Sequence, residues 1–183
     1  MNYKGIMVNH ISYMLVKKID AIKFRKYPEL VVASTKNNDE NTAFGILFDY
    51  ISGKNHSRKK IAMTSPVISS KKIPMTSPVF SKNEYMAFSL PEKYSKETAP
   101  VPTHSEVSID VIPKRILAVI RFSGKTNKKR IKKYTLKLQN RLDMENIKTT
   151  GDVFLLRYNS PFTPGFLRRN EVAIELANFD KKS

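Results

Sequence analysis

The chain has 183 residues, 40% of them hydrophobic, with 10 phenylalanines, 8 tyrosines and no cysteine. The lack of cysteine excludes disulfides, thiolate metal sites and thiol nucleophiles, and no run of ~18 apolar residues predicts a membrane-spanning helix. With 33 basic against 16 acidic residues, the formal net charge of +17 favours contact with polyanions, unless the lysines are simply a solvated surface. We expect one soluble cytoplasmic domain over residues 1–183.

The first third of the chain predicts two strands and a helix. Alternating side chains predict a strand at residues 21–27, which Pro28 ends, and a second short apolar run follows at 30–35. Residues 37–39 supply capping side chains for a helix that ends at Ser52 and Gly53. This helix has apolar residues at i, i+3, i+4 and i+7, which predict one packed face: Phe44, Leu47, Phe48 and Ile51.

A nine-residue phrase then occurs twice. Residues 59–67 read Lys-Lys-Ile-Ala-Met-Thr-Ser-Pro-Val, and residues 71–79 repeat them with Pro74 in place of Ala62. Ile, Met, Ser and Val fall at alternate positions, which predicts a strand with one buried face in each copy. The predicted inward residues are Ile61, Met63, Ser65 and Val67 in the first copy and Ile73, Met75, Ser77 and Val79 in the second.

The rest of the chain predicts five more strands and a second helix. The strands are expected at residues 85–90, 106–112, 115–122, 153–158 and 171–177, with a proline-rich loop at 91–103. The helix is expected at 126–146, with an apolar stripe of Ile131, Tyr134, Leu138 and Leu142. The order of strand, strand, helix, strand, strand occurs twice. It predicts an α+β fold of two similar halves, with two helices on an antiparallel sheet or barrel.

The sequence contains no catalytic signature. It lacks a Gly-x-Ser-x-Gly elbow, a phosphate-binding glycine loop and a His-Glu-x-x-His zinc motif. Its three histidines, His10, His56 and His104, are far apart in sequence and stand in polar segments, so we expect no metal site from them. We therefore predict that the protein is not an enzyme.

The second predicted helix is strongly basic. Eight lysines and arginines and no acidic residue lie between Lys125 and Arg141. Several of them stand four residues apart, where like charges destabilise a helix by a few tenths of a kcal/mol per pair. Lys129, Lys133 and Lys137 form the predicted polyanion patch. No nucleic-acid recognition motif accompanies them, so only weak, non-specific binding is expected.

The aromatic residues of the first helix suggest an apolar ligand site. Phe44, Leu47 and Phe48 are expected to face strands that carry Met63, Met75, Met86 or Phe88. Ligand pockets are mostly apolar, and methionine adapts to irregular shapes. The same pattern is also that of an ordinary core, and spacing alone favours the core.

The doubled phrase resembles the hallmark of the SOUL haem-binding protein family, whose prokaryotic and plastid members often carry two copies. The resemblance covers roughly residues 18–177, which implies a core at 18–177, an N-terminal extension at 1–17 and a tail at 178–183. Further segments resemble family motifs in the same order. They are Phe24–Pro28, Tyr50–Asn55, Ala118–Gly124 and Tyr158–Val172.

This resemblance implies a distorted antiparallel barrel flanked by two helices, with pseudo-twofold halves, similar to effector-binding domains of multidrug-responsive regulators. It implies non-enzymatic binding of haem, another tetrapyrrole or a similar hydrophobic ligand in an apolar cleft, for carriage, buffering or sensing. The cleft residues would be Lys26, Phe44, Leu47, Phe48, Met63, Met75 and Phe88. Arg168 and Arg169 are candidate contacts for haem propionates, the alternative being a structural pairing with Glu171.

One residue departs from the animal members of the family. Some of them have a histidine, the proposed iron ligand, where this chain has Lys26. A lysine amine is protonated at neutral pH and is therefore a poor iron ligand. We expect haem to bind without an axial histidine, either through hydrophobic contact or with a thioether from Met63 or Met75. Two alternatives remain: a regulator-like effector-binding module, and a polyanion- or partner-binding protein that uses the second helix. The oligomeric state is left open.

Overall fold

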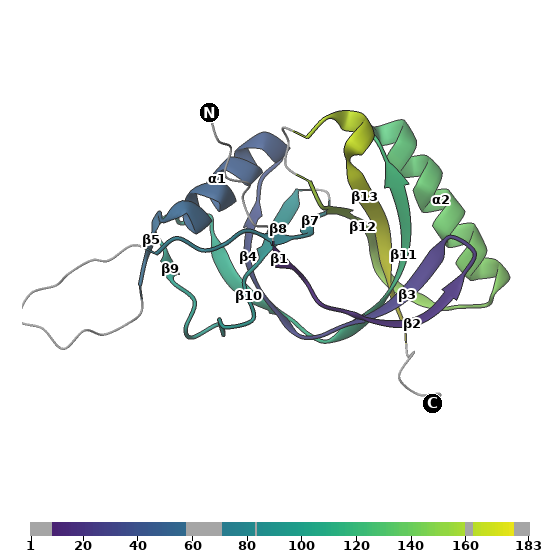
Figure 1. Ribbon diagram of the computed structural model, residues 1–183, viewed down its shortest axis with the longest axis horizontal. Coiled ribbons are helices and arrows are strands. Elements are labelled where there is room, and N and C mark those ends of the chain that lie inside the picture. Colours follow the sequence, from purple (N-terminus) through teal and green to yellow (C-terminus); the bar gives the residue numbers. More distant parts are fainter. Residues whose placement is uncertain (1–8, 58–70, 83, 160–162, 178–183) are drawn as a thin grey trace, which may run out of the picture. The chain divides into compact units, whose positions relative to one another are not determined.

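The computed structural model describes residues 9–57, 71–82, 84–159 and 163–177, and Figure 1 shows how its elements follow one another. The strands are β1 (Asn9–His10), β2 (Met14–Ile19), β3 (Ile22–Tyr27), β4 (Leu30–Lys36), β5 (Asn55–His56), β6 (Thr76–Ser77), β7 (Val79–Lys82), β8 (Tyr85–Ser89), β9 (Val101–Pro102), β10 (Ser108–Ile112), β11 (Arg115–Ser123), β12 (Thr149–Arg157) and β13 (Arg169–Leu176). The helices are α1 (Glu40–Ser52) and α2 (Lys128–Met144), with a short 3₁₀ turn, η1 (Gly165–Leu167).

The strand order confirms an α+β fold built from two similar halves. One nine-stranded sheet has the order β10-β4-β8-β7-β12-β13-β11-β3-β2, and β1-β6 and β5-β9 form two small pairs. Without the edge strand β2, the order reads the same from both ends. In this comparison β3, β4, β7 and β8 of the first half correspond to β10, β11, β12 and β13 of the second half, respectively. The two halves therefore share one pairing pattern, although they share little sequence.

The chain forms two compact units, and strands from each half of the chain lie in the other half's unit. The first unit comprises Met1–Ile11, Leu30–Ser77 and Asn83–Ile112. The second comprises Ser12–Glu29, Pro78–Lys82 and Pro113–Ser183. Strand β10 therefore pairs with β4 in the first unit, and β3 pairs with β11 in the second.

Helix α1 of the first unit has defined ends and a buried face. The Asp39 carboxylate accepts a hydrogen bond from the backbone N–H of Thr42 at 2.8 Å, and Gly53 ends the helix with a φ of 121°. The buried residues are Ala43, Leu47, Tyr50 and Ile51, and α1 packs against β4 and β8. The predicted apolar face was right for Leu47 and Ile51 but wrong for Phe48, whose side chain is 42% exposed.

The alternation predicted one continuous strand in the second copy of the repeated phrase, and this prediction was wrong. Residues 71–75 have no regular structure, and Pro78 separates β6 from β7. Pro74 and Pro78 have no N–H to donate, so neither can continue a hydrogen-bonded ladder. The first copy, with Ile61, Met63, Ser65 and Val67, lies outside the described residues.

Asn55 joins the end of α1 to the start of this second copy. Its buried side chain donates to the carbonyl oxygens of Tyr50 at 2.6 Å and Lys71 at 2.9 Å. Its Oδ1 accepts a hydrogen bond from the Lys71 N–H at 3.0 Å. The side chain thus links the last turn of α1 to the irregular backbone at Lys71 and supplies hydrogen-bond partners there.

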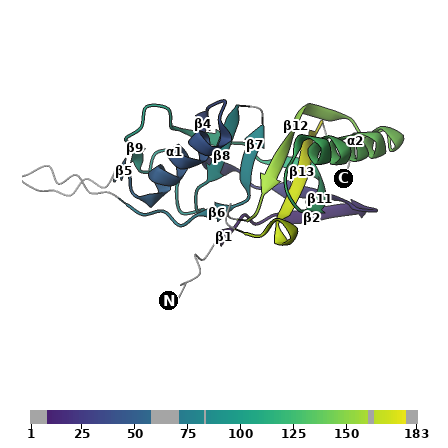
Figure 2. The same ribbon diagram turned by 90° about the horizontal axis from the view of Figure 1, so that it is seen from above.

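The second unit has its core between its strands and α2. Leu138 and Leu142 are the buried residues of α2, which packs against β11 and β13, as Figures 1 and 2 both show. The Phe122 and Tyr134 rings stack with their centroids 4.7 Å apart. Strand β2, which the sequence analysis did not predict, pairs with β3 and presents mostly exposed side chains.

Replacing Asn55 with alanine should lower the free energy of unfolding by about 3 kcal/mol, because buried backbone groups lose their partners. Urea denaturation followed by circular dichroism measures this loss. Asn41→Ala, at an exposed position on α1, is the control and should change stability by less than about 0.5 kcal/mol. Equal stability of the two variants would show that the Asn55 contacts do not matter.

Candidate functional site

The first unit carries an exposed aromatic surface on α1, formed by Phe44 and Phe48. These rings stand one helical turn apart and stack at an interplanar angle of 14°, with centroids 6.0 Å apart. The Phe44 ring meets Phe88 of β8 edge-on, with centroids 5.3 Å apart. Exposure increases outward from the buried Phe88, through the half-buried Phe44, to the exposed Phe48. The surface therefore has a packed base and an open ring.

A separate pocket of about 290 Å³ lies in the same unit. This volume is at the lower end of the range for small-ligand sites. Its lining is Ile11, Leu30, Thr76, Ser89, Leu90, Pro91 and Glu92. None of the site residues predicted from the sequence lines it, among those that the structure describes.

The remaining predicted cleft residues lie in different settings. Leu47 and Phe88 are buried, so the alternative of ordinary core packing describes their present contacts. Met75 is half-buried just before β6, and Met63 lies outside the described residues. Lys26 belongs to β3 of the second unit, opposite Ile116 of β11. A ligand-binding role for each of these residues stays a prediction.

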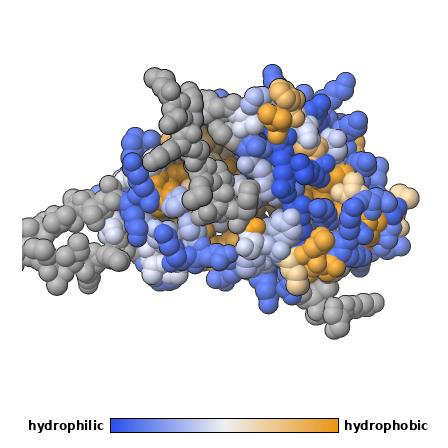
Figure 3. Space-filling model, viewed as in Figure 1, coloured by the Kyte–Doolittle hydropathy of each residue, from blue (hydrophilic) through white to orange (hydrophobic). Residues whose placement is uncertain are grey.

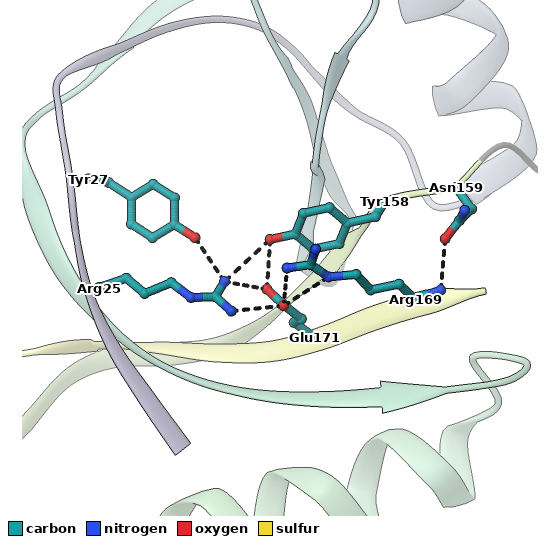
Figure 4. A network of polar contacts seen from close by, with 6 residues as sticks. All are labelled: Arg25, Tyr27, Tyr158, Asn159, Arg169 and Glu171. Atoms are coloured by element: carbon teal, nitrogen blue, oxygen red, sulfur yellow. Dashed lines mark hydrogen bonds and ion pairs between the residues drawn. The ribbon is translucent and has the colours of Figure 1, made fainter. Parts of the chain in front are cut away.

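The second unit contains a buried charged network around Glu171 of β13 (Figure 4). Arg25 of β3 donates from Nη1 to Oε2 at 2.6 Å and from Nη2 to Oε1 at 2.9 Å, a bidentate ion pair. Arg169 donates to Oε1 at 2.7 Å, and the Tyr158 hydroxyl donates to Oε2 at 2.7 Å. Both carboxylate oxygens are thus occupied.

Aromatic rings enclose the two guanidinium groups of this network. The Arg25 guanidinium carbon lies 4.4 Å from the ring centroid of Tyr13, and that of Arg169 lies 3.9 Å from the ring centroid of Tyr158. Arg25 also donates to the Tyr27 hydroxyl at 3.3 Å. Cation–π contact of this kind stabilises a guanidinium whose water has been removed.

The network fixes the protonation states of its members. Burial by itself raises the pKa of Glu171. The hydrogen bonds and charge of Arg25 outweigh burial, and with help from Tyr158 and Arg169 they lower the pKa below its usual value. Burial, together with the neighbouring Tyr27 and Glu171, raises the pKa of Tyr158, so its hydroxyl keeps the proton it donates. Glu171 is therefore an ionised carboxylate with no free oxygen to offer a cationic effector.

The sequence analysis found only part of this network. The sequence analysis gave the pairing of Arg169 with Glu171 as the alternative to a propionate contact, and this pairing is confirmed. A surface pair was expected, but the carboxylate is 0% exposed. Arg25 and Tyr158 were not predicted as partners. The available signal was an arginine on the same strand face as the aromatic Tyr27, within a strand of alternating side chains.

The other predicted anion contacts lie on the surface of the second unit. Arg168 donates from Nε to the Thr163 carbonyl oxygen at 2.7 Å, and its contact with an anion stays a prediction. Lys129, Lys133 and Lys137 are exposed on α2, on the side away from the buried Leu138 and Leu142. The polyanion patch therefore exists as an exposed basic face, and its binding role stays a prediction.

The family model of the SOUL heme-binding protein matches residues 8–175. This chain therefore belongs to the SOUL heme-binding protein family. No curated protein matches it.

Two groups of solved structures share the fold. The EcmrR C-terminal domain is similar with a TM-score of 0.54 and 11% identity, over 90% of this chain and 98% of that one. A hydrolase from Listeria innocua is similar with a TM-score of 0.57 and 12% identity, over 88% and 94% of the two chains. At these identities the likeness establishes the fold and nothing about the chemistry.

Two further findings concern the described residues alone. None of their helices is long and apolar enough to cross a membrane. They also contain no group of three or more histidine, aspartate or glutamate side chains placed to hold a metal ion.

Replacing Glu171 with glutamine should destabilise the protein by about 3–5 kcal/mol at pH 7, because the substitution leaves a buried arginine without its charge partner. Since the pKa of Glu171 is lowered by folding, its stabilising contribution is present above the unfolded-state carboxyl pKa of about 4.3. The contribution is lost as the pH falls from there through the folded-state value. The stability gap between wild type and variant should therefore narrow below about pH 4.

Urea midpoints measured from pH 7 downward give this gap directly. Glu175→Gln on the same strand is the matched control, since Glu175 is 36% exposed and meets Arg115 at 3.4 Å. It should cost less than about 1 kcal/mol. A gap for Glu171→Gln that stays constant to low pH would contradict the ionised state assigned to this carboxylate.

Proposed function

We propose that this protein binds haem or a related flat, apolar tetrapyrrole on the α1 aromatic surface, without catalysing a reaction, for carriage, buffering or sensing. Membership of the SOUL heme-binding protein family supports the class of ligand. The observation that supports the place is Phe48, a phenylalanine that is 42% exposed while it stacks on a ring anchored to the core.

The surface suits the face of a macrocycle. Aromatic rings favour offset-stacked or edge-on contacts with other π-systems, and burying an exposed phenylalanine is favourable by about 2 kcal/mol. Gly45 stands three residues before Phe48, and a Cβ placed there would meet no atom within 4 Å. The helix surface beside the Phe48 ring therefore has open space, which a flat ligand needs in order to approach.

The described residues at this surface fit the macrocycle but supply no iron ligand. Helix α1 contains neither histidine nor methionine, so its contribution is apolar contact. When bound, haem supplies an iron centre whose reactivity depends on its axial ligands. The thioether of Met75 or Met63 remains the predicted protein ligand, if the protein supplies one.

The charge of the chain favours a dianionic ligand. A net charge of +17 attracts the two propionates at long range, and lysine or arginine side chains pair well with carboxylates. Propionate contact by Arg168 or Arg169 stays a prediction on which the α1 surface does not depend, because both residues belong to the second unit. Glu171 itself cannot pair with a cationic effector, because its oxygens are occupied by Arg25, Arg169 and Tyr158.

Haemin titration followed by absorbance tests the proposal. The wild type should shift the Soret band at micromolar protein, and Phe48→Asp should weaken binding at least tenfold, about 1.4 kcal/mol, because it places a charge against the macrocycle. Leu136→Asp is the matched control, since Leu136 is 48% exposed on α2. An unchanged haemin spectrum with wild-type protein would overturn the function. Equal weakening by both variants would overturn only the site.

A variant with His10, His56 and His104 all replaced by alanine should keep haemin affinity within about threefold and keep the same Soret maximum, since we propose no imidazole ligand. The same titration measures both quantities. Loss of the Soret shift in this variant, with unchanged circular dichroism, would show that a histidine binds the iron.

A further inference from the structure

Two adjacent apolar side chains project from the second unit at η1. Phe166 is 79% exposed and Leu167 is 62% exposed, and we call this pair the η1 tip. Figure 3 shows an apolar cluster at the position of η1, beside strongly hydrophilic side chains. Isolated exposed apolar residues are common on protein surfaces, whereas contiguous apolar patches rimmed by polar residues mark interaction sites.

The η1 tip stands on a defined turn. The Leu167 N–H donates to the Pro164 carbonyl oxygen at 3.0 Å, and the Arg168 N–H donates to that of Gly165 at 3.2 Å. The Gly124 N–H donates to the Arg168 carbonyl oxygen at 3.2 Å. The buried Asn170 amide returns a hydrogen bond to the Gly124 carbonyl oxygen at 2.8 Å. The turn is thus hydrogen-bonded to the segment that leads into α2.

Basic side chains surround the η1 tip. The aliphatic part of Lys125 lies against Gly165, where an added Cβ would come within 3.1 Å of the Lys125 Cγ. Arg130 donates to the Ser123 carbonyl oxygen at 2.9 Å, beside the same segment. Residues 121–142 contain nine lysines and arginines and no acid, and residues 163–170 contain two arginines and no acid. The tip therefore lies near the N-terminal end of α2, the helix that carries the exposed basic face of Lys129, Lys133 and Lys137.

We propose that the η1 tip and the basic face of α2 dock this protein on an anionic lipid surface. Phe166 and Leu167 would enter the headgroup region, and the lysines of the basic face of α2 would lie against the lipid phosphates and carboxylates. Apolar insertion combined with basic side chains is the pattern by which peripheral proteins hold such surfaces. A nucleic acid would use the charges but would leave the aliphatic Leu167 without a favourable partner. The proposal does not depend on haem binding.

Tryptophan fluorescence gives a direct test, because the chain contains no tryptophan. Phe166→Trp places one at the η1 tip. Met144→Trp places one at a residue that is 73% exposed, at the opposite end of α2. Vesicles of phosphatidylcholine with about 30% phosphatidylserine should shift the emission of Phe166→Trp to shorter wavelength and leave Met144→Trp unchanged. Pure phosphatidylcholine vesicles, or about 0.5 M salt, should abolish the shift.

Vesicle co-sedimentation of full-length variants completes the test. The double variant Phe166→Asp, Leu167→Asp should bind anionic vesicles at least about tenfold more weakly, and Lys128→Glu with Lys129→Glu should do the same. Met144→Asp should bind like wild type, and circular dichroism confirms that each variant is folded. Absence of wild-type binding, or equal binding to pure phosphatidylcholine, would overturn the proposal. A tip variant that keeps full vesicle binding would also overturn the proposal. If the tip variant and the wild type bind duplex DNA equally tightly, the basic face would be assigned to nucleic acid.

Discussion

The buried ion pair between Arg25 and Glu171 constrains the second unit more than any other contact. It joins β3 to β13 across 146 positions of sequence, and Tyr158 ties the residue that follows β12 to the same carboxylate. An unpaired buried charge costs several kcal/mol, so any strand register that separates these groups is penalised. Because β3 comes from the first half of the chain, this pair holds a first-half strand within the second unit.

The same network also defines what the second unit can bind. Two arginines share one carboxylate, so the cluster carries an excess positive charge while its only acid is saturated. The carboxylate of Glu171 is therefore not available to a ligand. The first unit differs: its α1 surface is apolar and open at Phe48. The exposed aromatic surface and the saturated charged network thus belong to different units.

The features that could be predicted from the sequence are those that local interactions determine. Periodicity was enough for both helices and most strands, and the Asp39 cap of the first helix could be predicted because it acts within one turn. Strand β2 was missed since its exposed side chains lack the alternation of a half-buried strand. The alternation of the second copy of the repeat wrongly predicted one strand, because its prolines cannot donate to a hydrogen-bonded ladder. The partner of Arg25 lies 146 residues away, and only the folded topology brings it there.

The composition of α2 links its stability to its surface. Like charges at i and i+4, such as Lys129 with Lys133, each destabilise a helix by a few tenths of a kcal/mol. The helix tolerates them because Asn127 caps it, Leu138 and Leu142 are buried, and Tyr134 stacks on Phe122. None of these stabilising contacts requires lysine on the opposite face. The repulsion is a cost in solution that a nearby anionic surface would relieve, and relief is greatest where apolar side chains hold that surface close. Phe166 and Leu167 stand near the N-terminal end of α2.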